Sequence, residues 1–344
     1  MAIQPGASSQ ESCVSLKTLI LTDADVGAAF DWAAAIAALR DAYGVDVTDA
    51  QFPPRSMARG QGLWLRTLSG VMPGQKYLGA KMIAASPRNA CASYLIPLFD
   101  GATMALEALM DAASITGLRT AATSALAARE LLDKPQPRVA VIGSGFEART
   151  HLEALAHSGP IGAVEVFSPR ESSRAAFCAA LADKGVAVTA AHSAQEAVQS
   201  ADLVICAARS RDESPTLRGA WLRPGMTVVS IGSTLPEQRE LDPEAIERAD
   251  LIVADMVEEV AHDTGDMIAA SAAGVAFADK LASLSAVVSG ARPGRTSPDQ
   301  IMLYKSVGAA IQDLTVAAMC VERARALGLG TEIPAPIQPV NKGK

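Results

Sequence analysis

The sequence predicts an α/β protein with two domains, one a doubly wound parallel sheet and the other an α+β unit. Three observations predict this architecture. The 344 residues exceed what one ordinary hydrophobic core contains. From about residue 138 to 290, short apolar strands alternate with helices, which is typical of a parallel sheet covered on both faces. Between residues 77 and 111, short strand patterns follow one another, which predicts an antiparallel sheet.

The N-terminal part of the chain is expected to contain one helix and that antiparallel sheet. Apolar residues recur at helical spacing over 22–40, with aspartates near its start as caps. The prolines of 52–70 favour extended chain. Asp100-Gly101 is a hairpin signal. Strands are expected at 77–86, 92–100 and 104–111.

Two long helices are expected to flank the parallel sheet. An alanine-rich helix is predicted at 112–132, where DKPQP (133–137) ends it and marks a domain boundary. Another is predicted over 298–328, packed back on the N-terminal domain. The strands between them are expected in 138–143, 163–168, 186–191, 202–208, 226–232 and 251–256.

Composition excludes several classes of function. The formal net charge of -7 argues against a nucleic-acid partner, because phosphate backbones are bound by basic faces. No apolar stretch is long enough for a membrane span, and no signal peptide is evident. The histidines have no metal-ligand spacing, so no metal site is expected. The scattered cysteines, without a CxxC pair, indicate a reduced cytoplasmic protein: Cys13, Cys91, Cys178, Cys206 and Cys320.

A glycine-rich turn follows the first strand of the alternating block. Its residues are Gly143, Ser144, Gly145, Phe146, Glu147 and Ala148, which fit the pattern GxGxxA. Gly143 permits a tight turn, Gly145 lets backbone approach a pyrophosphate, and Ala148 lets the helix pack on the strand. The free N–H groups of the helix then attract the phosphates. This predicts a dinucleotide-binding Rossmann domain; the alternative is a plain strand–helix turn without a ligand.

The end of the next strand bears on the choice of cofactor. Ser168 stands there in place of an Asp or Glu, which would hold the ribose 2′-hydroxyl of NAD. Arg170 follows and suits a 2′-phosphate, although it can equally be a solvated loop residue. The sequence therefore favours NADP(H), with NAD(H) possible.

Several segments together resemble one family. They are PPR (53–55), GVMPG with LGAK (70–81), ITGLRTAATSALA (115–127), VIGSGFEARTHLEAL (141–155), IGSTLPEQRELD (231–242) and LYKSVGAAIQDL (303–314). This set, which covers most of the chain in order, resembles the ornithine cyclodeaminase/mu-crystallin family, and a ketimine reductase-like member in particular. The resemblance implies a homodimer in which 1–117 and 300–344 form the substrate-binding and dimerisation domain. It implies that 118–299 form the NAD(P)-binding Rossmann domain.

The family resemblance also implies a function and its residues. The substrate carboxylate would be held by Arg55, Lys81 and Arg119, whereas Arg66 is expected to be solvated. Like charges beside Lys81 would lower its pKa, so that it could donate a proton. The implied cofactor contacts beyond the glycine turn are Arg119, Thr120, Ser168, Arg170, Ala207, Ala208, Gly232 and Ser306.

Departures from the family pattern lie near the same sites. Glu147 stands where the family usually has Gln, and Cys206-Ala207-Ala208 replaces a threonine-containing stretch. The segment after Asn89 is shorter than usual, which places the expected cofactor-contacting threonine near Cys91 or Ser93.

The expected reaction is NAD(P)H-dependent reduction of a small carboxylated imine, or interconversion of an amino acid with its imino acid. Two alternatives are ornithine cyclodeamination and cofactor-dependent binding without turnover, as mu-crystallin's hormone binding suggests. Cyclodeaminases carry an Asp where this chain has Thr234. A threonine cannot pair with a substrate ammonium as a charge or act as a base, which argues against cyclodeamination. Thr234 can otherwise simply cap the strand end.

Overall fold

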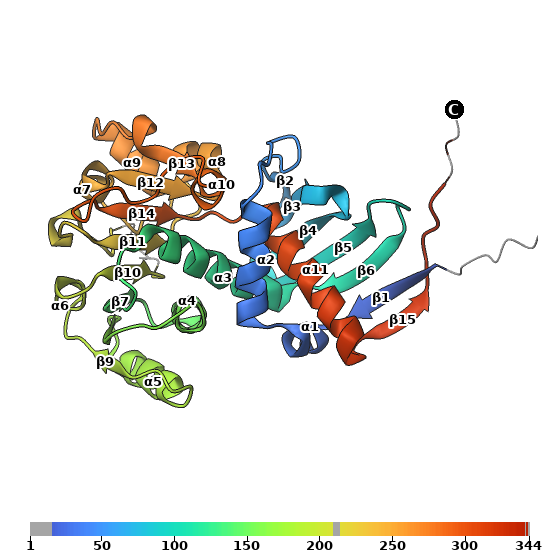
Figure 1. The fold of residues 1–344 in the computed structure, drawn as a ribbon, viewed down its shortest axis with the longest axis horizontal. Coiled ribbons are helices and arrows are strands. Elements are labelled where there is room, and N and C mark those ends of the chain that lie inside the picture. The colour runs from blue at the N-terminus through green and yellow to red at the C-terminus, as the bar shows by residue number, and fades with distance from the viewer. Residues whose placement is uncertain (1–15, 209–213, 341, 343–344) are drawn as a thin grey trace, which may run out of the picture.

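The computed structural model describes residues 16–208, 214–340 and 342. Within these ranges the chain forms two lobes, each built around one β-sheet (Figure 1). Helix α3 (Ala113–Leu131) runs between them and contacts strands of both sheets. The expected fold class, a doubly wound parallel sheet plus an α+β unit, is confirmed.

The first sheet has seven strands in the order β15-β1-β6-β5-β4-β3-β2. β1 and β6 run parallel, and the other neighbouring pairs are antiparallel. The expected strands and the turn after Asp100 are confirmed, whereas β1 and β15 have no counterpart in the sequence prediction. The strands are β1 (Lys17–Leu21), β2 (Ser56–Gly60), β3 (Leu63–Val71), β4 (Tyr77–Ser86), β5 (Cys91–Asp100), β6 (Leu106–Asp111) and β15 (Thr331–Pro334).

Helices cover one face of this sheet. α1 (Asp23–Ala29) and α11 (Ala310–Leu327) contact its strands directly, and α2 (Trp32–Tyr43) packs on α11 and α3. The single helix expected over 22–40 is wrong, because the chain is extended at Phe30 and Asp31. Thr22 and Asp25 form a capping box that starts α1, and the side chain of Asp31 caps α2.

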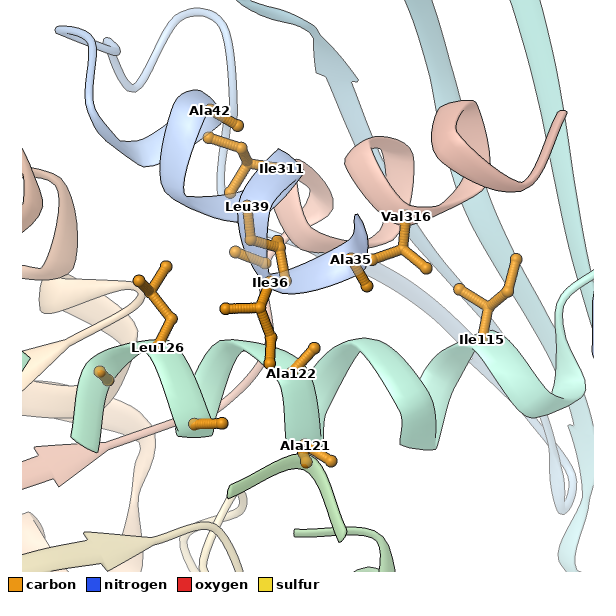
Figure 2. Packing of buried hydrophobic residues seen from close by; sticks show 14 of the residues in the cluster. Ala35, Ile36, Leu39, Ala42, Ile115, Ala121, Ala122, Leu126, Ile311 and Val316 are labelled. Atoms are coloured by element: carbon orange, nitrogen blue, oxygen red, sulfur yellow. The ribbon is translucent and has the colours of Figure 1, made fainter. Parts of the chain in front are cut away.

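The junction between the lobes is a helix-on-helix core. Figure 2 shows Ile36 and Leu39 of α2 directed towards α3, where Ala122 and Leu126 lie, with Ile311 of α11 close by. These side chains are at most 9% exposed. Because alanine has so short a side chain, α3 can approach its neighbours closely. Its alanine-rich sequence therefore fits a helix that is buried between two lobes.

The second sheet has eight parallel strands in the order β13-β12-β14-β11-β10-β7-β8-β9. Its strands are β7 (Val139–Ile142), β8 (Val164–Phe167), β9 (Val188–Ala190), β10 (Leu203–Cys206), β11 (Thr227–Ser230), β12 (Leu251–Ala254), β13 (Leu281–Ser283) and β14 (Met302–Lys305). The order reverses between β7 and β10, so that the crevice at their carboxyl ends is where a doubly wound sheet binds ligands.

Short helices connect these strands. They are α4 (Phe146–His157), α5 (Glu171–Ala182), α6 (Ala194–Gln199), α7 (Pro243–Arg248), α8 (Val257–Asp263), α9 (Gly265–Ala272) and α10 (Leu284–Val288). Single 3₁₀ turns are η1 (Pro73–Gln75), η2 (Pro87–Asn89), η3 (Gly219–Trp221) and η4 (Ala278–Lys280). None of the helices in the described ranges is both long and apolar enough to cross a lipid bilayer.

The expectation of one helix over 298–328 is wrong. Its first part is strand β14, which lies between β12 and β11, and α11 begins only at Ala310. All four residues of β14 are buried, so the strand has no alternation that separates it from a buried helix. The strand belongs to the parallel sheet, although residue 300 was the expected start of the other domain.

Candidate active site

The glycine turn has the geometry that a dinucleotide requires. Gly143 has φ +117°, and a Cβ built there would lie 2.6 Å from the Ala207 carbonyl oxygen. A Cβ at Gly145 would meet no heavy atom within 4 Å, so that its backbone faces open space. Gly145 is also the N-cap of α4, and no side chain caps the helix. The N–H groups of the first turn are therefore available to a phosphate.

A cavity of about 890 Å³ runs along the carboxyl ends of β7, β8 and β10. Ala148 does not line it and is fully buried, which fits its packing role. Phe146 does not line it either: its ring lies against α3, where a Cβ at Gly117 would be 2.2 Å away. Of the expected cofactor residues, the cavity is lined by Gly143, Ser144, Gly145, Ser168, Arg170, Ala207 and Ala208.

The end of β8 carries no acidic side chain on this cavity. Ser168 is 6% exposed and accepts a hydrogen bond from the Ser144 hydroxyl (2.9 Å). Arg170 and Ser173 both line the cavity, and the Arg170 Nε donates to the Ser173 hydroxyl at 3.1 Å. A second arginine, Arg174, donates to the Ser168 carbonyl (2.7 Å) and so shapes the turn.

A smaller cavity of about 310 Å³ adjoins the first at Ala207. Glu147, expected in the glycine turn, lies on this cavity instead, and burial raises the pKa of its carboxyl group. The lining residues from the prediction are Arg119, Thr120, Glu147, Ala207, Gly232, Thr234 and Ser306. The two cavities adjoin beside the glycine turn, and we call the smaller one, which Arg119 and Thr234 line, the reactive-end cavity.

Arg119 and Lys81 share one carboxylate. Asp313 Oδ1 lies 2.8 Å from both Lys81 Nζ and Arg119 Nε, and all three side chains are buried. Burial lowers the pKa of Lys81 to about 8, helped by the charge of Arg119 and opposed by Asp313. We call Lys81, Arg119 and Asp313 the clamp cluster; with two cations and one carboxylate, it carries an excess of positive charge.

Arg55 lies in a different position from the one expected. It forms an ion pair with Glu259, and its guanidinium donates to the Val307 carbonyl (3.4 Å). Arg119 touches the next residue, because a Cβ at Gly308 would lie 2.7 Å from its guanidinium. Arg55 and Arg119 thus meet neighbouring residues of the turn after β14, but only Arg119 of the three expected cations lines the smaller cavity.

The carboxylate of Asp255 fixes the backbone of that turn, a role that was not predicted from the sequence. Asp255 follows β12 and accepts hydrogen bonds from the Ser306 hydroxyl (2.6 Å) and the N–H groups of Val307 and Gly308 (3.0 and 2.8 Å). Gln312 donates to it as well (3.0 Å) and accepts from Arg119 (2.5 Å). An acid directly after a parallel strand was the signal that could have identified it.

A second buried network lies at the ends of β10 and β11. Glu240 accepts hydrogen bonds from the N–H groups of Ala208 (3.1 Å) and Gly232 (2.8 Å) and from the Ser230 hydroxyl (2.6 Å). The Ser230 hydroxyl in turn accepts from Lys305, whose Nζ lies 2.8 Å from Asp266. We call Glu240, Asp266 and Lys305 the strand-end cluster.

The strand-end cluster contains one cation and two carboxyl groups, and all three residues are fully buried. Burial is the main cause that raises the pKa of Glu240 to about 7, and Lys305 opposes it. None of its side chains lines either cavity. None of these residues was predicted as a site residue, although Glu240 and Lys305 lie in two of the motifs that carry the family resemblance.

Thr234 lies on the smaller cavity, as expected. Its N–H (3.0 Å) and hydroxyl (3.3 Å) both donate to the Gln238 side-chain oxygen. Two acids could in principle take the place of the Asp that cyclodeaminases carry at this position. Glu237 is exposed and does not line this cavity, and the carboxylate of Asp255 already accepts hydrogen bonds from the turn after β14. Across residues 16–208, 214–340 and 342, no group of three His, Cys, Asp or Glu side chains is arranged to hold a metal ion.

Comparison with known proteins identifies the family. Residues 17–328 match the model of the ornithine cyclodeaminase/mu-crystallin family. The chain belongs to this family. It is 30% identical over 324 residues to an alanine dehydrogenase of Archaeoglobus fulgidus, covering 92% of this chain and 98% of that protein. It is 30% identical over 263 residues to the ketimine reductase mu-crystallin of Rattus norvegicus, covering 74% and 80%.

A solved structure agrees with these relatives. The Δ1-pyrroline-2-carboxylate reductase of Thermococcus litoralis, solved with NADH and L-proline, is 28% identical and superposes with a TM-score of 0.83. The match covers 92% of this chain and 100% of that one. The expected family and the expected class, an NAD(P)-dependent oxidoreductase of carbon–nitrogen bonds, are confirmed.

Proposed function

We propose that this family member reduces an imine whose carbon also carries a carboxylate, or runs the reverse oxidation of the amino acid. One observation carries the proposal: Arg119 stands on the wall of the reactive-end cavity and shares Asp313 with Lys81. An arginine fork suits a carboxylate. The excess positive charge of the clamp cluster therefore favours an anionic substrate beside the cofactor.

The residues of the chain supply position and protons. When bound, the nicotinamide supplies or accepts the hydride. Gly143, Gly145 and the start of α4 hold the dinucleotide, and Arg119 orients the substrate carboxylate. Lys81, which shares Asp313 with Arg119 behind the cavity wall, is the proposed source of the proton for the substrate nitrogen. Only one of its N–H groups is taken by Asp313, and its pKa of about 8 is near working pH.

The proposal is tested by mixing purified protein with NADPH or NADH and candidate substrates. Δ1-pyrroline-2-carboxylate, or pyruvate with ammonia, should cause loss of the reduced cofactor's absorbance. Ornithine with NAD should yield neither proline nor ammonia, because Thr234 offers no charge to a second amine. Cofactor binding without turnover of any imine or amino acid would overturn the proposal.

The preference for NADP(H) is a further part of the proposal. It is supported by the end of β8, where Ser168 replaces an acid and Arg170 with Ser173 faces the cavity. Arg170→Ala should weaken binding of NADPH while leaving the Kd for NADH unchanged. Equal affinity of the wild-type protein for the two cofactors would contradict the preference.

We also propose a homodimer that forms through the open face of the seven-stranded sheet. α11 covers one face, towards which Leu68 and Ile96 point, whereas Leu65 and Leu95 on the other face are 40% and 37% exposed. Light scattering should report a dimer for the wild-type protein and a monomer for Leu95→Glu. Leu327→Glu, at an exposed residue of α11, is the matched control and should stay dimeric. The expected cytoplasmic location stays a prediction.

A further inference from the structure

The inner face of the seven-stranded sheet carries more cations than the clamp cluster uses. The register pairs Met57 with Arg66 and Leu68 with Lys81, so Arg66 and Lys81 project from the same face of β3 and β4. Arg55 is paired with Glu259, and Lys81 and Arg119 share Asp313. Arg66 forms no ion pair with any residue in the described part of the chain.

Arg66 is not the solvated residue that the sequence analysis expected. It is half-buried, and its Nε is buried without a hydrogen-bond partner in the described residues. Its guanidinium carbon lies 5.2 Å from the centre of the Trp64 ring. Burial and then the charge of Arg55 lower its pKa, yet an arginine stays protonated. The carboxylate of Glu259 opposes this lowering, but it is paired with Arg55 and forms no ion pair with Arg66. A half-buried guanidinium whose charge is offset only in this way is unfavourable, and a bound anion would relieve it.

Arg66 lines a cavity of about 570 Å³ between the β2–β3 hairpin and the segment 234–238. Arg59 and Trp64 line the same cavity from the hairpin, and Leu235 and Glu237 line it from the segment. The neighbouring residues Thr234 and Gln238 of that segment line the reactive-end cavity. The two cavities therefore lie on either side of one short segment.

The position of Arg66 also links it to the clamp cluster. Its charge contributes to lowering the pKa of Lys81, which places the two cations near one another. A substrate that is held by Arg119 in the reactive-end cavity and that passes the segment 234–238 would therefore place its far end at Arg66. The only acid that lines the 570 Å³ cavity is Glu237, which is exposed, so its repulsion is screened by solvent.

We propose that Arg66 binds a second anionic group of the substrate, so that the enzyme acts on an imine or amino acid with two carboxylates. This inference rests on the proposed function and deepens it. The Trp64 ring fixes the plane of the guanidinium, and the N–H groups along the edge of the guanidinium then donate hydrogen bonds to the second carboxylate. A substrate with an apolar or cationic side chain leaves Arg66 unpaired and binds more weakly.

Binding of simple acids to the full-length protein with saturating NADPH tests the inference without turnover. Malonate, succinate and glutarate are compared by calorimetry with propionate, butyrate and valerate, and 3-phosphonopropionate tests whether a phosphonate replaces the second carboxylate. At least one dicarboxylate should bind about tenfold more tightly than its monocarboxylate match. A phosphonate that binds more tightly than every dicarboxylate would overturn the choice of carboxylate.

Variants assign the effect to Arg66. Arg66→Gln should remove the dicarboxylate advantage and leave monocarboxylate affinity unchanged, and Arg66→Lys should keep part of it. Arg88→Gln is the matched control, because Arg88 is exposed and near the same hairpin, with its Nε 2.9 Å from a Cβ built at Gly62. An unchanged advantage in Arg66→Gln, or an equal loss in Arg88→Gln, would overturn the inference.

Turnover separates this inference from the proposed function. Oxaloacetate with ammonia and pyruvate with ammonia are each mixed with NADH. If Arg66-dependent binding is found but no imine is reduced, the proposed function is wrong and the second anion site stands. If both keto acids are aminated equally well by the wild-type protein and by Arg66→Gln, the function stands and the second anion site is wrong.

Discussion

The clamp cluster and the strand-end cluster contain the same kinds of side chain and behave differently. Lys81 and Lys305 are both buried, and each lies 2.8 Å from an aspartate. The clamp cluster has two cations for one carboxylate and reaches a cavity wall through Arg119. The strand-end cluster has one cation for two carboxyl groups and lines neither cofactor cavity.

Two properties distinguish a cluster that binds substrate from one that stabilises the fold: its net charge and whether it reaches a cavity. A cluster with net positive charge at a cavity wall can form an additional ion pair with a bound anionic substrate. A cluster away from the cavities, whose hydrogen bonds go to strand ends, can only fix the backbone that forms the cavity. We therefore expect substitutions in the clamp cluster to reduce catalysis, and those in the strand-end cluster to reduce stability or, through the backbone that borders the cavities, cofactor affinity.

The largest expected effect is that of Lys305→Met on stability. Removal of Lys305 leaves Asp266 buried without its cation, and loss of one partner from a buried ion pair costs about 3–5 kcal/mol. Urea denaturation, followed by circular dichroism, measures the free energy of unfolding. A variant as stable as the wild-type protein would contradict the supporting role of the strand-end cluster.

Lys81→Met is expected to have the opposite effect: a small loss of stability and a large loss of activity. Asp313 keeps Arg119 as its partner, so the loss of stability should be smaller than that in Lys305→Met. The kcat for imine reduction should fall about 100-fold or more, because general acid catalysis contributes about 10²–10⁴-fold. Stopped-flow kinetics at saturating substrate measures it. A wild-type kcat would exclude Lys81 as the proton donor.

Glu240→Gln is expected to act on cofactor affinity with an intermediate effect. The Glu240 carboxylate accepts from the N–H groups of Ala208 and Gly232, which border the two cavities. Its pKa is raised to about 7, so the carboxylate loses an acceptor site as the pH falls through that value. The Kd for the cofactor should then rise several-fold below pH 7 in the wild-type protein.

Fluorescence titration of NADPH between pH 6 and 8 measures this dependence. Glu240→Gln, which carries no titrating group, should have a raised Kd that no longer varies with pH in this range. If Glu240→Gln kept the wild-type pH dependence, the effect would have to arise from another group.

The sequence predicted local features well and pairings across the chain poorly. The glycine turn and the alternating strands depend on neighbouring residues, and the structure has them where they were expected. Lys81 and Asp313 are 232 positions apart, and Arg119 and Gln312 are 193 apart. Only the packing of α11 against both β4 and α3 brings them together, and no local pattern contains that packing.

The prediction of a helix over 298–328 failed for the same reason. Lys305 and Ser306 were expected within that helix, whereas Lys305 ends β14 and Ser306 begins the turn whose backbone Asp255 fixes. Motif resemblance identified Arg55, Lys81 and Arg119 by residue, but not which of them lines the cavity. Arg66 was assigned to solvent because sequence does not reveal that a hairpin covers a cavity.

The smallest effect, and the sharpest test of the comparison, is a shift in the pH profile of Asp313→Asn. Imine reduction needs protonated Lys81, so kcat in the wild-type protein should fall as the pH rises above about 8. Asp313 raises the pKa of Lys81 and Arg119 lowers it, so removal of the aspartate charge should move this limb to lower pH. Glu259→Gln is the matched control, because its buried carboxylate pairs with Arg55 and is not among the main causes of the shift in the pKa of Lys81. Profiles of kcat from pH 6 to 10 at saturating substrate separate the cases. A shift in both variants would indicate a general loss of charge in the cleft, whereas a shift in Asp313→Asn alone would assign the titrating group to the clamp cluster.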